Sequence, residues 1–324
     1  EFLWQEGHTA HENEEDARRE TMRMLEIYRD FVEGFLAIPV IAGQKTPSEK
    51  FAGAVDTYSI EAMMKDGRAV QAGTSHYLGT NFAEAFDIKF LDRNNTLQYV
   101  HTTSWGVSTR LIGALIMVHG DDKGLVLPPK VAPTQVIIIP VGPPKTREQV
   151  LKKVDDIYAE LKAAGIRVRV DDSQEASPGW KFNEYEMRGV PVRIELGPRD
   201  LEKGEAVLAL RTGGDKRSVP LDGIAESVRA ALEEVHAVMF ARAKEMLEAN
   251  TWSVETLAQL KGDIETKRGF ALAGWCGSDG CEAKVKEETG YTSRNIPFEP
   301  AERKERCLVC GGPAAHTVVY ARAY

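Results

Sequence analysis

The chain has 324 residues, of which 43% are hydrophobic and 28% are charged, a composition typical of a globular protein with a sizeable core and two or three domains. Its formal net charge of -8 predicts no general attraction to nucleic acid or to anionic membranes. No apolar stretch is long enough to span a bilayer and the N-terminus has no signal-peptide pattern, so we expect a soluble, intracellular protein.

The first third of the sequence predicts a strand, a long helix and a run of antiparallel strands. The opening EFLWQEGHTAH alternates with a period of two, which places Phe2, Trp4, Glu6 and His8 on one strand face. Residues 11–36 predict a helix capped by Asn13. Its expected apolar face is Leu25, Tyr28, Phe31, Val32 and Phe35. Short strands with Gly and Asn punctuation follow, and residues 109–120 predict a buried helix that is apolar nearly all round.

The pattern changes after a proline-containing segment at residues 121–135, which predicts a linker. Apolar strands then alternate with amphipathic helices, as in a small α/β domain with a largely parallel sheet. A long helix at residues 223–250 and a second at 254–269 lead into a final unit. We therefore expect three domains, at residues 1–127, 128–222 and 223–324.

All four cysteines lie in this final unit, as two pairs. Four residues separate Cys276 from Cys281, and Cys307 and Cys310 form a CxxC motif followed by two glycines. Two thiolates on a tight turn, joined by a loop to a second pair, favour a tetrahedral zinc ion. Disulfides or four unrelated thiols are the alternatives. A zinc shell filled by four cysteines is closed, so we expect a structural metal.

Two polar segments interrupt the predicted sheet where apolar residues are expected. QAGTSHYLG holds Gln71, Thr74 and His76, and HTTSWGVSTR ends at Arg110, where the apolar helix begins. A cation at a helix N-terminus opposes the helix dipole, a cost that a bound anion would offset. Arg110 therefore predicts a phosphate site, although half of a surface ion pair is the alternative.

The same segments carry a family resemblance. EFLWQEGHTAH resembles the second half of motif 2 of a class II aminoacyl-tRNA synthetase, and TTSWGVSTRLIGALIMVHGDDKGLVLPP resembles motif 3. With SPGWKFNEYEMRGVPVRIELGPRD and the cysteine unit, the whole chain resembles prolyl-tRNA synthetase of the archaeal and eukaryotic type. This resemblance implies part of the antiparallel catalytic sheet, an α/β anticodon-binding domain and a small zinc-binding α+β domain.

Family members place motif 1, the Thr-x-Glu proline loop and the first arginines of motif 2 upstream of EFLWQEG. We therefore expect this chain to correspond to the C-terminal part of a synthetase and to be inactive in proline activation by itself. The resemblance further implies ATP, Mg²⁺ and Zn²⁺ as cofactors and substrates, L-proline and tRNA(Pro) as partners, a homodimer and a cytoplasmic location.

The resemblance also implies roles for individual residues in attaching proline to tRNA(Pro) through prolyl-adenylate. Arg110 would hold the phosphates of ATP during catalysis. The other expected nucleotide contacts are Phe2, stacked on adenine, with Gln71 and Thr74. The expected proline-binding residues are Trp4, Glu6, His8, His76, Trp105 and Ser108. Aromatic walls suit the proline ring, and a carboxylate or imidazole suits its amine. Core packing is the alternative for Phe2 and Trp4.

The α/β segment resembles the anticodon-binding domain of the family. Its candidate RNA contacts are Lys181, Glu184, Arg188, Arg199 and Arg211. Guanines present acceptors to Arg and Lys and donors to Glu, so a mixture of charges suits an anticodon that contains GG. Such local contacts would reconcile RNA binding with the acidic chain, although a solvated surface charge is the alternative for each residue.

In similar proteins the last tyrosine lies against the body of the enzyme with its carboxylate near the active site, and Tyr324 matches it. A non-catalytic tRNA-binding protein derived from a synthetase is the alternative function. Gln71, His76 and Arg110 favour the enzyme, because a binding module has no use for them. Threonyl, glycyl and histidyl synthetases share the anticodon domain but are disfavoured by the EFLWQEGHTAH and GTSH strings.

Overall fold

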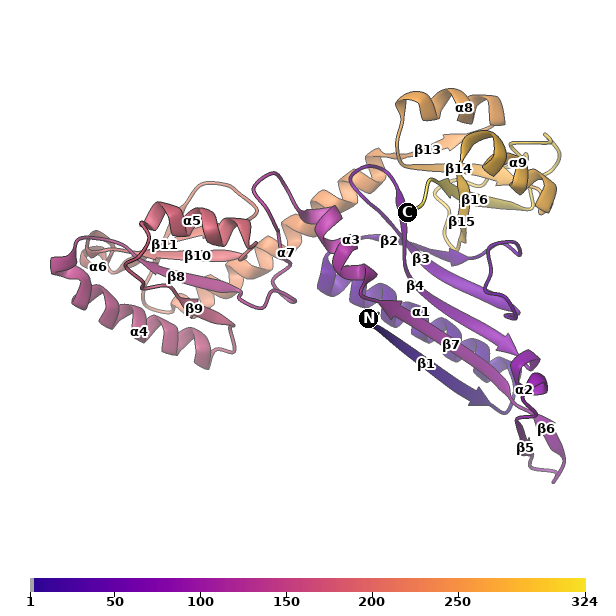
Figure 1. Ribbon diagram of the computed structural model, residues 1–324, viewed down its shortest axis with the longest axis horizontal. Coiled ribbons are helices and arrows are strands. Elements are labelled where there is room, and N and C mark those ends of the chain that lie inside the picture. The colour runs from indigo at the N-terminus through magenta and orange to yellow at the C-terminus, as the bar shows by residue number, and fades with distance from the viewer. Residues whose placement is uncertain (1–2) are drawn as a thin grey trace. The chain divides into compact units, whose positions relative to one another are not determined.

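The computed structural model describes residues 3–324, which form two compact units (Figure 1). The first comprises the residues up to Gly34, Ile38–Val118 and Lys244–Tyr324. The second comprises Phe35–Ala37 and His119–Ala243. The helix α7 (Ile224–Ala249) begins in the second unit and ends in the first. No helix in the described part of the chain is long and apolar enough to cross a bilayer.

The first unit is built on one large sheet. Its N-terminal elements are β1 (Trp4–His11), α1 (Glu14–Leu36), β2 (Val40–Gln44), β3 (Asp56–Met63), β4 (Ala69–Gly79), α2 (Asn81–Ala85), β5 (Lys89–Leu91), β6 (Leu97–Tyr99), β7 (His101–Ser108) and α3 (Arg110–His119). Its C-terminal elements are β13 (Thr251–Val254), α8 (Leu257–Thr266), β14 (Phe270–Trp275), α9 (Asp279–Thr289), β15 (Thr292–Pro297) and β16 (His316–Ala321).

Nine strands of this unit pair in the order β1-β7-β4-β3-β2-β15-β16-β14-β13. All neighbours are antiparallel except β13 and β14, which are parallel. The expected antiparallel sheet is thus confirmed. The β2–β15 pair, with Ile296 opposite Gln44, joins the strands of the first third to those of the cysteine unit. The sequence did not indicate this junction, since it pairs strands about 250 residues apart.

The helix α1 packs along one face of this sheet (Figure 1). The Asn13 side chain caps it by accepting a hydrogen bond from the Asp16 amide at 2.9 Å, as predicted. Its buried residues are Ala17, Thr21, Leu25, Tyr28, Val32 and Leu36. Phe31 and Phe35, expected on this face, are exposed. The helix α3 is also less buried than expected, because Ile112 is 62% exposed.

Within the second unit lies a smaller five-stranded sheet. The elements of this unit are β8 (Val136–Pro140), η1 (Pro144–Thr146), α4 (Arg147–Ala163), β9 (Val168–Val170), α5 (Pro178–Met187), β10 (Val192–Leu196), α6 (Pro198–Lys203), β11 (Glu205–Leu210) and β12 (Arg217–Pro220). The strand order is β12-β11-β10-β8-β9. Its core is a cluster of aliphatic residues from these strands, α4 and α7.

The prediction of a largely parallel sheet was wrong in part. The strand β8 runs parallel to β9 and β10, but β10–β11 and β11–β12 are antiparallel pairs. The connection from β10 to β11 holds only the short α6. A parallel crossover needs about a dozen residues or more, so this connection returns the chain antiparallel.

Candidate functional site

A cavity of about 420 Å³ opens on one face of the large sheet, within the first unit. It is lined by Trp4, Glu6, Lys45, Glu49, Phe51, Thr57, Gln71, Thr74, His76, Ser104, Trp105 and Gly106. Six of these residues were candidate ligand contacts from the sequence. The structure therefore brings together β1, β4 and β7, strands that lie far apart in the chain.

The strand register explains why these side chains share a face. In the β1–β7 and β4–β7 pairs, Gly106 lies opposite both Glu6 and Thr74, and Ser104 lies opposite His76. Residues directly opposite in an antiparallel pair point to the same side of the sheet. Trp4, two residues before Glu6, joins the same face. Its indole is 59% exposed, so it is available as a wall for a bound ligand.

Gln71 reaches this face through a β-bulge. Gln71 and Thr74 are three residues apart, which in a regular strand would place them on opposite faces. The β3–β4 register shifts here, with Glu61 opposite Gln71 but Ile60 opposite Gly73. The extra residue at Ala72 turns the Gln71 side chain back to the cavity side.

Trp105 borders the cavity, but its indole lies on the other face of the sheet. It is opposite Gly7 and Ser75, and the Ser75 hydroxyl donates to the Thr21 carbonyl of α1 at 2.7 Å. A Cβ atom on Gly7 would lie 2.3 Å from the indole. The Trp105 ring thus packs behind β1. The role of Trp105 in shaping the proline pocket stays a prediction, since the residue is part of the cavity lining while its ring packs against Gly7.

His76 is a neutral hydrogen-bonding group in the cavity wall. Burial lowers its pKa to about 4. Its Nδ1 atom lies 2.9 Å from Thr57 Oγ1, which also accepts from the Phe51 amide at 3.0 Å. The His76 tautomer decides which of these two atoms donates, and a Thr57 hydroxyl that donates to Nδ1 leaves the imidazole proton on Nε2. The imidazole can then donate one hydrogen bond to a ligand.

Sequence reasoning missed part of the wall. Lys45, Glu49 and Phe51 come from the loop between β2 and β3, and Thr57 comes from the start of β3. The Phe51 and His76 ring centroids are 5.0 Å apart. An exposed aromatic residue in a polar loop was the one signal that marked this segment.

Other expected site residues lie outside the cavity lining. His8 is exposed and contacts Glu6 at 3.3 Å, and Ser108 accepts from the Arg110 amide at 3.3 Å. Arg110 begins α3 with an exposed side chain. Phe2 lies outside the described residues.

Tyr324, the last residue of the chain, is exposed and does not line the cavity. Its hydroxyl donates to Asp66 at 2.6 Å, beside the turn between β3 and β4. The Arg68 guanidinium lies 5.0 Å from the centroid of its ring. The chain end is therefore fixed at the turn, while the expected position of its carboxylate near the active site stays a prediction.

The five expected RNA contacts of the second unit divide into two groups. Lys181 and Arg211 are buried, with side chains 4% and 2% exposed. The Lys181 ammonium contacts the Asp171 carboxylate at 2.7 Å, and Arg211 makes a two-pronged contact with Asp121 at 2.6 and 2.8 Å. These partners indicate structural roles.

The remaining three residues are more accessible. Arg188 is 57% exposed and pairs with the partly exposed Glu184 on α5 at 2.5 Å. Arg199 lies exposed on α6. An exposed guanidinium keeps its donors available, so Arg188 and Arg199 are better placed than Lys181 and Arg211 to meet an external acceptor.

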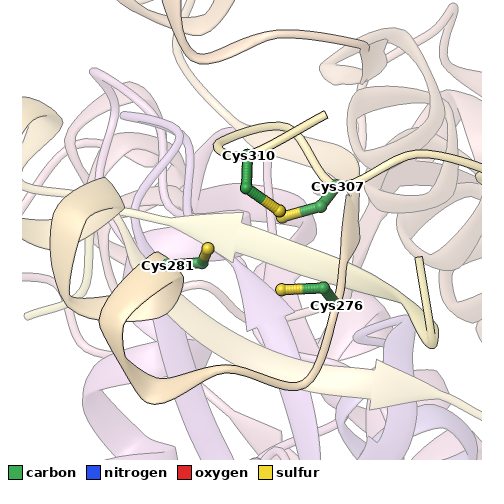
Figure 2. Close-up of side chains that lie close together, drawn as sticks. All are labelled: Cys276, Cys281, Cys307 and Cys310. Atoms are coloured by element: carbon green, nitrogen blue, oxygen red, sulfur yellow. The ribbon is translucent and has the colours of Figure 1, made fainter. Parts of the chain in front are cut away.

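The four cysteines converge in the C-terminal part of the first unit. Figure 2 shows Cys276, Cys281, Cys307 and Cys310 pointing toward one point, and their sulfur atoms all lie within 4.8 Å of one another. No two of them form a disulfide. Gly311 adopts a φ of 68°, which closes the CxxC turn and suits glycine. The predicted cluster is confirmed as an arrangement that can hold a metal ion.

The chemistry of this cluster fits zinc. Although burial opposes ionisation, the backbone amides of Cys310, Val309 and Cys276 lower the pKa of the Cys307 thiol to about 7. Amide donors around a thiolate are the expected support for a zinc-bound sulfur. Four thiolates would complete a tetrahedral shell and leave no position for substrate. Among the described residues, no other group of three or more His, Cys, Asp or Glu side chains is arranged to hold a metal.

Comparisons with known proteins cover the whole chain. Three family models match: tRNA synthetase class II core domain (G, H, P, S and T) at residues 1–119, anticodon binding domain at 135–231, and prolyl-tRNA synthetase, C-terminal, at 257–324. A proline--tRNA ligase of Symbiobacterium thermophilum is 66% identical over the entire chain, which spans 68% of that relative. Proline--tRNA ligase 2 of Bacillus cereus and proline--tRNA ligase of Natranaerobius thermophilus are each 53% identical, with 67% of their lengths covered.

Proposed function

Because this chain belongs to the prolyl-tRNA synthetase family, we propose that the full-length protein catalyses ATP-dependent attachment of proline to tRNA(Pro) through prolyl-adenylate. The observation that carries this proposal is the cavity, in which Trp4, Glu6 and His76 meet Gln71 and Thr74. A small apolar ring with a charged secondary amine requires such a mixture of aromatic wall, carboxylate and hydrogen-bonding groups.

For proline recognition, the indole of Trp4 and the ring of Phe51 offer apolar walls, while Glu6 offers a carboxylate to the amine. His76 is neutral because burial lowers its pKa to about 4, so it does not repel the ammonium group of proline. The exposed His8 beside Glu6 would lie at the rim of this pocket, and Ser108 shares the strand face of Trp4.

For activation, the carboxylate of proline attacks the α-phosphate of ATP in line, and pyrophosphate leaves. This step depends mainly on positioning and on positive charge near the phosphates. We assign the nucleotide to Phe2, Gln71, Thr74 and Arg110. The position of Arg110 at the N-terminus of α3, where both the side chain and the helix dipole favour anions, supports a phosphate contact.

Metals have separate roles in this proposal. The four cysteines would hold a structural Zn²⁺ that stabilises the C-terminal part of the unit. Mg²⁺ would neutralise phosphate charge during activation and usually binds through the nucleotide with one or two carboxylates. We therefore assign it no dedicated cluster of protein ligands.

For tRNA, we propose that the second unit contacts the anticodon of tRNA(Pro) through Arg188, Arg199 and Glu184. The match of residues 135–231 to an anticodon binding domain supports this assignment. Lys181 and Arg211 would act by holding the fold. A homodimer and a cytoplasmic location stay predictions.

Proline-dependent exchange of pyrophosphate into ATP tests the proposal in the full-length protein. We expect exchange with proline and none with threonine, glycine or histidine, followed by charging of tRNA(Pro). Binding of tRNA(Pro) without exchange would instead support the alternative, a non-catalytic tRNA-binding protein.

A further inference from the structure

The loop from Lys45 to Phe51 carries three residues of the cavity wall, Lys45, Glu49 and Phe51. Its middle, from Pro47 to Ser48, is exposed. At its far end, the Phe51 amide donates to Thr57 Oγ1, and the same oxygen contacts His76. Phe51 is therefore held at the far end of the loop by Thr57, and the path of the loop between Lys45 and Phe51 depends on how its beginning is held.

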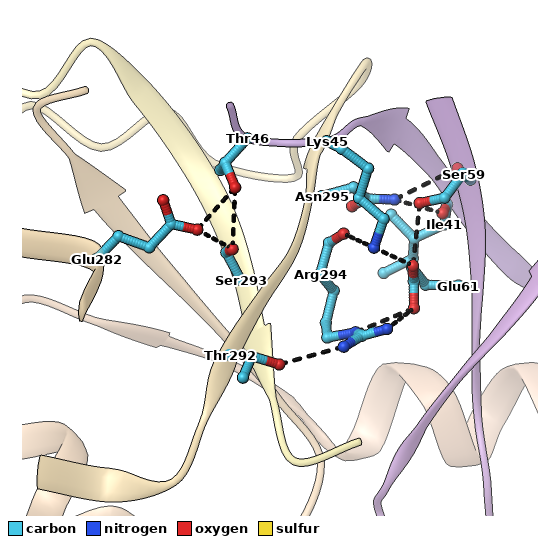
Figure 3. A network of polar contacts seen from close by, with 10 residues as sticks. All are labelled: Ile41, Lys45, Thr46, Ser59, Glu61, Glu282, Thr292, Ser293, Arg294 and Asn295. Atoms are coloured by element: carbon cyan, nitrogen blue, oxygen red, sulfur yellow. Dashed lines mark hydrogen bonds and ion pairs between the residues drawn. The ribbon is translucent and has the colours of Figure 1, made fainter. Parts of the chain in front are cut away.

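Lys45 begins the loop as a buried cation. Its side chain is 3% exposed, and its ammonium group donates to Glu61 Oε1 at 2.9 Å and to the backbone carbonyl of Arg294 at 2.6 Å (Figure 3). The Lys45 amide also donates to the Thr57 carbonyl at 2.8 Å. Burial lowers the pKa of Lys45, and the Glu61 carboxylate acts in the opposite direction.

Glu61 connects this cation to the C-terminal strands. It is fully buried, and its Oε2 atom accepts from Arg294 Nε and Nη2, both at 3.0 Å. Its Oε1 atom accepts from Lys45 and from the Ser59 hydroxyl at 2.9 Å. Both oxygens thus have two donors each, a fully satisfied carboxylate. Arg294 belongs to β15, so the contact joins the cysteine unit to the cavity side of the sheet.

Thr46, the next residue of the loop, makes a second buried connection. Its hydroxyl donates to Glu282 Oε1 at 2.7 Å and lies 3.2 Å from the Ser293 hydroxyl, which also contacts Glu282 (Figure 3). Glu282 lies on α9, directly after Cys281. Lys45 is therefore held by the Arg294 carbonyl of β15, and Thr46 by side chains of β15 and α9.

We propose that the cysteine-bearing C-terminal part of the first unit positions the loop from Lys45 to Phe51, and thereby the wall of the proline pocket. The positioning residues are Lys45, Thr46, Glu61, Glu282 and Arg294. The loop delivers Phe51 and Glu49 to the cavity, and the amides of Glu49 and Lys50 donate to the Thr46 carbonyl at 3.1 and 3.0 Å, so a displaced Thr46 displaces this part of the loop. Buried polar contacts tolerate little displacement, because a shifted group is left unsatisfied in a low-dielectric interior. This inference rests on the proposed function only in naming proline as the ligand of the cavity.

Two variants test the proposal in the full-length protein. Thr46→Val keeps the shape of the side chain but removes its hydroxyl, and Arg294→Met removes the contacts to Glu61. We expect each to raise the KM for proline about tenfold while leaving the KM for ATP nearly unchanged, as befits loss of one buried hydrogen-bonded contact. Thr46→Ser restores the hydroxyl and should restore the KM for proline. Thr266→Val, which makes the same change at an exposed position of α8, is the matched control and should resemble the wild type.

Limited trypsin cleavage gives a readout that needs no activity. Lys50 is exposed, and a loosened loop should be cut after it several times faster in Thr46→Val than in the wild type or Thr266→Val. If Thr46→Val does not fold, Arg294→Lys, which keeps the charge but loses the two-pronged contact, is measured in its place.

Unchanged KM for proline and unchanged cleavage in folded variants would overturn the proposal. An equal rise in the KM for both substrates would also overturn it, because general destabilisation would then explain the result. Absence of proline-dependent exchange in the wild type would refute the proposed function instead, and cleavage after Lys50 would still decide whether the loop is anchored as described.

Discussion

Gly7 and Trp105 lie directly opposite each other in the β1–β7 pair, and the indole covers the glycine so closely that a Cβ atom would fall 2.3 Å from ring atoms Cε2 and Nε1. The side of β1 that faces α1 must therefore carry no side chain at this position. The other side of β1 presents Trp4 and Glu6 to the cavity. The packing of Gly7 against Trp105 therefore fixes the position of the strand that carries these two cavity residues.

The substitution Gly7→Ala should destabilise the protein by about 1–3 kcal/mol, since the indole must move to admit the methyl group. It should also raise the KM for proline by shifting β1. Chemical denaturation and pyrophosphate exchange measure the two effects. Gly34→Ala is the control, because a Cβ atom there would meet nothing within 4 Å in the helix α1. Equal stability of the two variants would contradict the packing described for Trp105.

His76 should make stability depend on pH. Its pKa falls from 6.5 to about 4 on folding, so the unfolded chain binds a proton between these values when the folded chain does not. Stability is therefore full above about pH 6.5 and declines as the pH falls toward 4. Between pH 7 and pH 5 this residue should account for a loss of about 2 kcal/mol.

Urea denaturation at pH 7 and pH 5 measures this loss, with His76→Gln as the reference because glutamine does not titrate. Lys45, Glu6 and Glu49 line the same cavity and remain in both proteins. An identical pH dependence in the wild type and in His76→Gln would show that the imidazole is not held neutral.

Arg110→Ala should reduce proline-dependent pyrophosphate exchange by a factor of about 100 to 1,000, because a positive charge directed at the reacting phosphates is lost. Its side chain is exposed, so the unfolding midpoint should barely change. Arg93→Ala, which removes another exposed arginine, from the turn between β5 and β6, should leave exchange intact. Near-normal exchange in Arg110→Ala would refute its assignment to the phosphates.

Arg188→Ala and Lys181→Met should separate RNA contact from structure. Loss of one Arg–guanine contact should weaken charging of tRNA(Pro) by about ten- to a hundredfold, equivalent to about 1–3 kcal/mol, with proline activation unchanged. Lys181→Met should instead lower the stability of the α/β unit, because the ammonium group that contacts Asp171 and the Ser173 carbonyl is lost. If Arg188→Ala impairs both reactions together, Arg188 supports the fold and does not contact RNA.

Cys307→Ser should abolish stoichiometric zinc binding and lower thermal stability, since a structural zinc site contributes directly to folding. Elemental analysis and differential scanning calorimetry measure the two effects. The Leu308 amide beside this cysteine donates to the Gly274 carbonyl of β14 at 2.9 Å, so the loss should extend into the large sheet. A wild-type protein that contains no zinc and whose four thiols react freely while folded would contradict the site.

Much of this protein could be predicted from its sequence because the relevant signals are local. The alternation of EFLWQEGHTAH, the cap at Asn13 and the CxxC turn each depend on residues close in the chain, and the structure has the corresponding strand, cap and cysteine cluster. The family resemblance likewise rests on ordered motifs, and the comparisons confirm it.

What only the tertiary structure decided depends on register and on distant contacts. The bulge at Ala72 puts Gln71 and Thr74 on one face, and the register of β7 turns the Trp105 ring away from the cavity. The connection of Lys45 and Glu61 to Arg294 crosses more than 200 positions of the sequence. The alternation of residue types along a strand predicts that successive side chains point to opposite faces of a sheet. Only the pairing of the strands determines which face borders the cavity and which residues meet there.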